Sequence, residues 1–305
     1  MVVLNRRAFM AVTAAGVIAP AVIGAKEVVA KGMDWMTMSL EERNLAFNNV
    51  AHVGPEFARK KTEGWATASK ALRAQRPKHL DLAYAQADRT KWDLYPATDP
   101  KAPCYVHIHG GYWQRGSKEI FACMAEGVLA RGWSAALPGY TLAPDASLTQ
   151  ITKELRTALD WFAAQAGAHG IAGPVILSGW SAGGHLTAVL LDHPTVAAGL
   201  SISGVFDLAA LRDSPHVNDK VKLTEVEIET LSPMRLRGVN KRLSITYGTG
   251  ELPAMIASSR DFHAYRAQAH LPGDLIPIIK TNHFTILDEL RLPNSRLTRA
   301  VLQMA

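Results

Sequence analysis

Short hydrophobic runs alternate with longer amphipathic segments along most of the chain. From Leu80 onward, helix-length segments such as 118–131 and 148–166 separate most of the later apolar runs. This alternation predicts βαβ units, and therefore an α/β fold with a mostly parallel sheet flanked by helices. Antiparallel pairing is expected only among the first, closely spaced runs. Eight runs have strand length: residues 80–85, 91–96, 104–110, 133–139, 174–179, 199–204, 242–248 and 274–280.

The residues before Leu80 follow a different, helical pattern. Ser39 stands three residues before Glu42, which is the spacing of a capping box at a helix start. Long helical stretches follow and are broken at Gly54-Pro55. We therefore expect a helical N-terminal arm over residues 31–78.

One connection late in the chain is unusually long. Residues 207–240 exceed what a single crossover needs and contain a charged helical piece. We expect a small cap insertion over the ligand site, with a plain crossover helix and long loop as the alternative. The arm, the sheet and this insertion together predict one domain over residues 31–305.

The first thirty residues differ from everything that follows. Arg6-Arg7 precede an apolar, small-residue run that ends near Ala25, too short and too weakly apolar for a comfortable membrane span. Residues 1–30 resemble a twin-arginine export signal, cleaved after Ala25 or Ala30, which implies the twin-arginine export machinery as a partner and a periplasmic or exported mature protein. An uncleaved membrane anchor and an ordinary N-terminal helix are the alternatives.

Composition narrows the partners further. The formal net charge of +6, about +4 after cleavage at residue 30, comes without a basic run interleaved with aromatics, so nucleic acid is not a favoured partner. Cys104 lies in a strand-like run and Cys123 in a helix-like one, which favours two buried free thiols over a disulfide. A homodimer remains open.

The stretch VILSGWSAGGHL, residues 175–186, carries the clearest chemical signal. An apolar run meets Gly179-Trp180-Ser181-Ala182-Gly183 and then a helical stretch. This G-x-S-x-G pattern is that of a nucleophile elbow, in which a tight strand-to-helix turn exposes the serine hydroxyl. A serine needs a histidine base, which in turn needs a carboxylate.

The chain order of such sites is serine, then acid, then histidine. Of six histidines after Ser181, only His283 stands in a loop just past a final strand; a helix cap at Thr285 is its alternative role. Glu251 is the first carboxylate after the preceding strand, and a solvated charge at a helix start is its alternative role. Asp261 and Asp213 are weaker candidates for the acid.

A third strand end supplies an oxyanion hole. In HIHGGYWQRGSKE, Gly110-Gly111 follow a strand and can turn backbone N–H groups toward the site, together with the N–H of Ala182. His107 and His109 face one side of that strand and form an alternative metal site. No matching ligand cluster occurs elsewhere, so no cofactor is implied.

These segments carry a family resemblance. HGGYWQRGSKE, LSGWSAGGHL, SGVFDLAAL and NHFTILDEL together resemble the α/β-hydrolase superfamily, and within it the kynurenine formamidase (arylformamidase) group related to hormone-sensitive-lipase-like esterases. The likeness runs from about residue 39 to the C-terminus. It implies an α/β-hydrolase fold with Ser181, Glu251 and His283 as nucleophile, acid and base, and Gly110-Gly111 as the oxyanion loop. The family's acid is usually Asp, and the longer Glu251 can keep its role.

The expected function is a serine hydrolase that cleaves an aryl formamide through an acyl-serine intermediate. Four aromatic residues beside the site would suit an aryl small-molecule substrate, although each could fill the core instead: Tyr112, Trp113, Trp180 and Phe284. A carboxylesterase or an amide or carbamate hydrolase is the runner-up, particularly because tryptophan catabolism is expected in the cytoplasm. A binding protein without chemistry and a metal amidohydrolase are the remaining rivals.

Overall fold

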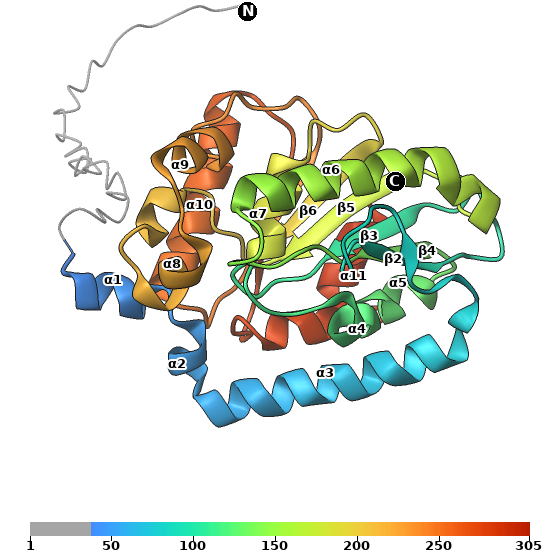
Figure 1. Cartoon of the computed structure of the whole chain (residues 1–305), viewed down its shortest axis with the longest axis horizontal. Coiled ribbons are helices and arrows are strands. Elements are labelled where there is room, and N and C mark those ends of the chain that lie inside the picture. The colour runs from blue at the N-terminus through green and yellow to red at the C-terminus, as the bar shows by residue number, and fades with distance from the viewer. Residues whose placement is uncertain (1–37) are drawn as a thin grey trace, which may run out of the picture. The chain divides into compact units, whose positions relative to one another are not determined.

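A computed structural model describes residues 38–305, which form an eight-stranded sheet with helices on both faces (Figure 1). The twin-arginine segment predicted at residues 1–30 lies outside the described residues. The strand order is β1-β2-β4-β3-β5-β6-β7-β8. The strands are β1 (Leu82–Ala83), β2 (Lys91–Tyr95), β3 (Cys104–Ile108), β4 (Ser134–Pro138), β5 (Val175–Trp180), β6 (Val196–Ile202), β7 (Leu243–Gly248) and β8 (Leu275–Ile278).

The pairing of these strands confirms the mostly parallel sheet. Every neighbouring pair from β4 to β8 is parallel, and only β1–β2 and β2–β4 are antiparallel. Parallel strands place their carboxyl ends at one edge, where the loops that follow β3, β5, β7 and β8 meet. Each of the eight hydrophobic runs forms a strand, although β1 is only two residues long.

Two groups of helices cover the two faces of the sheet (Figure 1). One face carries α6 (Leu148–Gln165), α7 (Ala182–Val189), α8 (Pro215–Val221), α9 (Glu225–Leu231) and α10 (Pro253–Gln268). The other face carries α3 (Pro55–Gln75), α4 (Lys118–Phe121), α5 (Glu126–Leu129), the 3₁₀ segment η6 (Thr285–Arg291) and α11 (Arg296–Leu302). The remaining elements are short: α1 (Leu40–Ala46), α2 (Asn49–Val53), η2 (Pro77–His79), η3 (Ala122–Ala125), η4 (Ala166–His169) and η5 (Leu208–Leu211).

The two cysteines lie in the cores on opposite faces of the sheet. Side chains alternate along a strand, so Cys104 points into the core beneath α6 and α7, whereas Tyr105 points into the core that also contains Cys123. Both cysteines are buried and free. This confirms the expectation of two buried thiols.

The expected helix over residues 118–131 is broken into α4, η3 and α5. In a continuous helix, the carbonyl of Ile120 would accept from the N–H four residues later. Here the Ile120 carbonyl accepts from Ser69 Oγ of helix α3 (2.8 Å), and Ser69 Oγ in turn accepts from the N–H of Cys123 (2.9 Å). A side chain from the arm therefore replaces a helical hydrogen bond, which a pattern confined to residues 118–131 could not reveal.

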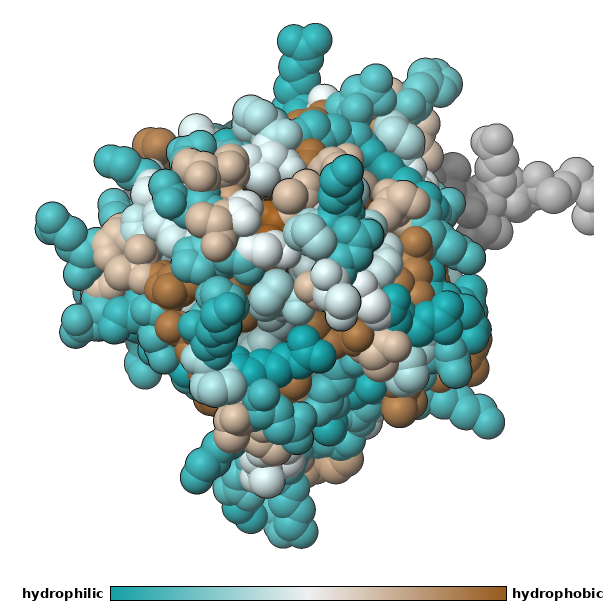
Figure 2. All heavy atoms as spheres, turned by 90° about the vertical axis from the view of Figure 1, so that its right-hand side faces the viewer, coloured by the Kyte–Doolittle hydropathy of each residue, from teal (hydrophilic) through white to brown (hydrophobic). Residues whose placement is uncertain are grey.

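Apolar side chains at the surface are scattered. On the face seen in Figure 2, hydrophobic residues form small groups among hydrophilic ones. No helix within residues 38–305 combines the length and apolar character needed to cross a membrane.

Candidate active site

Ser181 occupies a strained turn between β5 and α7. Its φ of 58° and ψ of −117° lie outside the regions that ordinary residues prefer, as expected of a nucleophile elbow. The turn closes tightly, because a Cβ on Gly183 would lie 2.0 Å from the carbonyl oxygen of Ile108, and one on Gly179 would lie 2.2 Å from that of Gly183. The N–H of Ser181 donates to the carbonyl of Ile202 (2.8 Å), which ties the turn to β6.

Glu251 and His283 form a buried pair on the loops after β7 and β8. His283 Nδ1 lies 2.8 Å from Glu251 Oε2, and the two side chains are 3% and 0% exposed. The second carboxylate oxygen, Oε1, accepts from Ser203 Oγ and from the N–H of Gly248, both at 2.6 Å. Since an ionised carboxylate only accepts, His283 Nδ1 carries the proton and its Nε2 is left as the acceptor.

The alternative roles considered for these residues find no support in the geometry. The two other candidate acids lie away from the imidazole: Asp213 pairs with Arg43 of helix α1, and Asp261 is exposed on α10. The cap on η6 is Asn282, whose Oδ1 accepts from the N–H groups of Phe284 and Thr285. His283 is therefore free of capping and is held by Glu251.

The loop after β3 brings Gly110 and Gly111 to the same edge. Neither position has room for a side chain: a Cβ would lie 2.5 Å from the Trp180 ring at Gly110 and 2.2 Å from the carbonyl oxygen of Arg115 at Gly111, where φ is also +120°. The Gly110 carbonyl contacts His109 Nδ1 at 2.9 Å. Because the peptide is planar and trans, the N–H of Gly111 points to the side away from that contact.

Ala182 is the first residue of α7, so its N–H has no partner inside the helix. The predicted oxyanion groups of Gly110, Gly111 and Ala182 therefore all belong to backbone beside Ser181.

His107 and His109 are buried, neutral side chains. Burial lowers the pKa of His107 to about 3 and that of His109 to about 4. His107 Nδ1 pairs with the hydroxyl of Tyr105 (3.0 Å), and the His109 ring stacks on that of Tyr140. Within residues 38–305, no group of three or more His, Cys, Asp or Glu side chains is arranged to hold a metal ion. The alternative metal site lacks further ligands there.

A pocket of about 450 Å³ opens at Ser181 and His283. Aromatic rings cluster in its wall: the Trp65 ring lies 6.0 Å from that of Trp180 and 6.2 Å from that of Phe284, and the Phe121 ring lies 5.7 Å from that of Trp180. Trp180 Nε1 also donates to the carbonyl of His283 (2.8 Å), which links the wall to the base. The pocket is therefore suited in shape and polarity to an apolar, aromatic group.

Three of the four predicted aromatic contacts lie in this wall, and one does not. Tyr112, Trp180 and Phe284 line the pocket, and the Tyr112 hydroxyl donates to the carbonyl of Phe47 (2.6 Å). Trp113 is 0% exposed and packs edge-on against His185, with ring centroids 5.0 Å apart, in the core beneath the loop. Trp113 therefore does not line the pocket as expected. The chain turns at Tyr112 (φ 50°) and Trp113 (φ 55°), which sends the second ring inward.

The contribution of the N-terminal arm was not predicted. Nine residues of α2, α3 and the turn before them line the pocket: Asn48, Asn49, Val50, Pro55, Ala58, Arg59, Thr62, Glu63 and Trp65. The available signal was the buried stripe of α3, in which Ala58, Trp65 and Leu72 recur at seven-residue spacing. By contrast, the segment 207–240 reaches the pocket only through His216.

Comparison with solved structures identifies the fold. A candidate thioesterase from Silicibacter sp. is 29% identical to this chain, with a TM-score of 0.76 over 86% of this chain and 99% of that one. Esterase B from Lactobacillus rhamnosis has a TM-score of 0.65 at 18% identity, over 84% and 96% of the two chains. This chain has an α/β-hydrolase fold.

Sequence relatives are similar to this α/β-hydrolase over most of its length. Kynurenine formamidase from Danio rerio is 24% identical over 89% of this chain and 98% of its own. Kynurenine formamidase from Salmo salar is 26% identical over 74% and 81% of the two chains. A family model described as BD-FAE matches residues 93–222, which include Gly110, Gly111 and Ser181. Together the relatives support a hydrolase of the amide or ester type.

Proposed function

We propose that this α/β-hydrolase is a serine hydrolase that cleaves an aryl formamide of the N-formylkynurenine kind through an acyl-serine intermediate. The observation that carries the proposal is the Glu251–His283 pair, whose free Nε2 belongs to the same pocket wall as the strained Ser181. The formamidase relatives supply the substrate class.

The geometry suggests how the first half-reaction proceeds. His283 Nε2 accepts the proton of Ser181 Oγ while Oγ bonds to the formyl carbon. Negative charge then develops on the carbonyl oxygen, and the N–H groups of Gly111 and Ala182 are placed to stabilise it. When the tetrahedral intermediate breaks down, the C–N bond cleaves and His283 donates its proton to the aniline nitrogen. The arylamine leaves, and a formyl ester of Ser181 remains.

Hydrolysis of that ester completes the cycle. His283 Nε2 takes a proton from water, the oxygen attacks the formyl carbon, and Ser181 Oγ recovers the proton as formate departs. Glu251 orients the ring and stabilises its charged form throughout, helped by Ser203 and the Gly248 N–H, which hold the carboxylate in place. The rings of Trp65, Trp180 and Phe284 suit the aryl part of the substrate.

A carboxylesterase is the second candidate, because the same serine, base and N–H donors act on esters and the solved neighbours include an esterase. An amide or carbamate with an aromatic leaving group fits the same pocket. We also propose that residues 1–30 direct export through the twin-arginine machinery, so the mature enzyme would work outside the cytoplasm.

The test compares hydrolysis of N-formylkynurenine and of 4-nitrophenyl acetate by the mature protein and by its Ser181→Ala variant. Fast formamide turnover that the variant loses is the expected result. Ester turnover without formamide turnover would retain the serine mechanism and replace formamidase by esterase. Activity that survives in Ser181→Ala would overturn the serine mechanism.

A further inference from the structure

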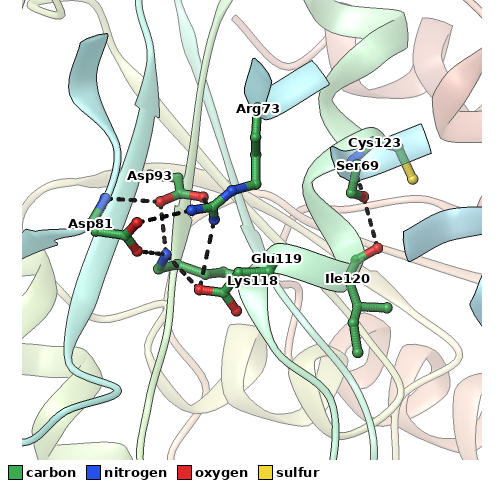
Figure 3. Close-up of polar contacts among 8 residues, drawn as sticks. All are labelled: Ser69, Arg73, Asp81, Asp93, Lys118, Glu119, Ile120 and Cys123. Carbon is green, nitrogen blue, oxygen red and sulfur yellow. Dashed lines mark hydrogen bonds and ion pairs between the residues drawn. The ribbon is translucent and has the colours of Figure 1, made fainter. Parts of the chain in front are cut away.

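A partly buried network of charged side chains joins the arm to the segment that follows the two glycines (Figure 3). At its centre, Lys118 Nζ donates to Asp93 Oδ1 (2.7 Å), Asp81 Oδ1 (2.5 Å) and Glu119 Oε1 (2.7 Å). The Lys118 side chain is 3% exposed and that of Asp93 is 0% exposed. All three ammonium protons of Lys118 are therefore committed to carboxylates from β2, from the turn before β1 and from its own helix.

Helix α3 completes the network from the arm. Arg73 Nη1 donates to Asp93 Oδ2 (2.6 Å), and its Nη2 donates to Asp81 Oδ2 (2.9 Å). Burial opposes ionisation of Glu119, but the hydrogen bonds from Lys118 and Ser117 outweigh it and lower the pKa of Glu119 to about 2. The carboxylate of Glu119 is thus ionised at neutral pH, so its bond to Lys118 is charge-assisted.

The network lies at the C-terminal end of the loop that carries Gly110 and Gly111. Gly116 packs directly on the start of this loop, because a Cβ there would lie 2.6 Å from the Gly110 carbonyl oxygen and 2.9 Å from His109 Nδ1. Arg89 Nη2 donates to the carbonyl of Gly116 (2.6 Å) and its Nε to that of Tyr140 (2.9 Å). The position of residues 116–118 therefore sets how the Gly110–Gly111 peptide lies, and with it the direction of the Gly111 N–H.

We propose that Lys118, held by Asp81, Asp93 and Glu119 and backed by Arg73 of the arm, is a positioning residue for the Gly111 N–H. It acts through the packing of Gly116 on Gly110. The same anchor fixes the start of α4, whose Ile120 and Phe121 line the pocket. This inference rests on the proposed serine mechanism, in which that N–H stabilises the oxyanion.

Buried ion pairs are weak evidence of a stabilising role. Replacing a buried ion network by well-packed apolar side chains is often neutral or stabilising, whereas its hydrogen bonds fix one geometry. A misplacement of about 1 Å in a reacting geometry can cost about 100-fold in rate. A positioning role therefore predicts an effect on kcat that is separable from the effect on stability.

The experiment uses Lys118→Met, the double variant Lys118→Met with Asp93→Asn, and Arg291→Met as a matched control. Arg291 forms a partly buried ion pair with Glu126 (2.8 Å) that lies outside the network and outside the pocket wall. For each protein we would measure Tm, kcat and KM with 4-nitrophenyl acetate, and Ki for phenylboronic acid, whose serine adduct is tetrahedral. If Lys118→Met does not fold, Lys118→Arg and Arg73→Gln take its place.

In Lys118→Met, kcat is expected to fall by about 10- to 100-fold with KM within about 3-fold, and the boronate Ki to rise in proportion. The double variant no longer buries a carboxylate that has lost its lysine partner, so it should recover Tm but not kcat. Arg291→Met should have a lower Tm and an unchanged kcat. Recovery of kcat together with Tm in the double variant, or an unchanged kcat in Lys118→Met, would overturn the positioning role.

Wild-type protein and Ser181→Ala are run in the same assay. Activity that does not depend on Ser181 would overturn the proposed function and the positioning role together. Activity that depends on Ser181 but not on Lys118 would overturn the positioning role alone.

Discussion

Two regions form the pocket, and their residues are held in place in different ways. At the sheet edge, Ser181, Glu251 and His283 each follow a strand, and each is fixed by bonds within a few residues of a strand end. The arm instead contributes Trp65 from a helix that precedes the whole sheet, and it is fixed by side-chain contacts to segments far away in sequence.

This difference indicates which kinetic constant each region should control. Under the proposed serine mechanism the sheet edge sets the reacting geometry, so changes there should act on kcat. Residues 48–65 of the arm shape the pocket wall, so changes there should act on KM and on the choice of substrate. Variants in each region should separate the effects on kcat from the effects on KM.

Glu251→Gln should lower kcat for the preferred substrate by about 10⁴-fold, because the neutral amide no longer fixes the His283 tautomer or stabilises its charged form. Asp261→Asn is the matched control, since Asp261 is an exposed acid on α10. Steady-state kinetics of both variants give the comparison. Equal losses in the two variants, or a loss confined to Asp261→Asn, would contradict the assignment.

Gly111→Ala should lower kcat by about 10²- to 10³-fold, as loss of one oxyanion donor does. Its Cβ would lie 2.2 Å from the Arg115 carbonyl oxygen, at a φ of +120°, so the loop must move. Gly167→Ala, where a Cβ meets nothing within 4 Å, is the control and should retain full kcat. A retained kcat in Gly111→Ala would show that this loop does not support the reaction.

Trp65→Leu should raise KM for phenyl acetate by about 10-fold while kcat changes by less than about 3-fold, because the arm supplies contact area and no reacting group. KM for ethyl acetate should change far less, which makes the aryl-to-alkyl ratio the informative quantity. Trp161→Leu, at a tryptophan stacked on His169 away from the pocket, serves as the control. A fall in kcat with an unchanged KM would assign Trp65 to the reacting geometry instead.

The last prediction concerns the stability of the fold and not its activity. Burial lowers the pKa of His107 to about 3 and those of His109 and His185 to about 4, whereas the unfolded chain protonates histidine near 6.5. The unfolded state therefore binds more protons below about pH 6.5, and the free energy of unfolding falls as pH falls from there toward 4.

Each of these histidines contributes a slope of at most about 1.4 kcal/mol per pH unit, reached between its lowered pKa in the folded state and 6.5. Urea unfolding of wild type and His107→Gln between pH 7 and 4 should differ in slope by about one such contribution. Parallel curves would mean that His107 takes up a proton in the folded state.

Most of the fold and the residues at the sheet edge could be predicted from the sequence, whereas the contribution of the arm to the pocket could not. Strand ends are local features, so the runs before Gly110, Ser181, Glu251 and His283 predicted which side chains gather at one edge. The inward turn of Trp113 depends on two consecutive residues in the left-handed region, which no hydrophobic pattern indicates. The pocket wall from α3 and the break after α4 depend on how the arm docks, and docking is a tertiary property.

The most direct test of the serine mechanism is the mass of the protein after reaction with diethyl 4-nitrophenyl phosphate, followed by peptide mapping. The serine mechanism predicts one diethylphosphoryl group per chain, located on Ser181, with loss of all hydrolytic activity and no labelling of Ser181→Ala. Full labelling of Ser181→Ala, or activity that persists in fully labelled protein, would contradict it.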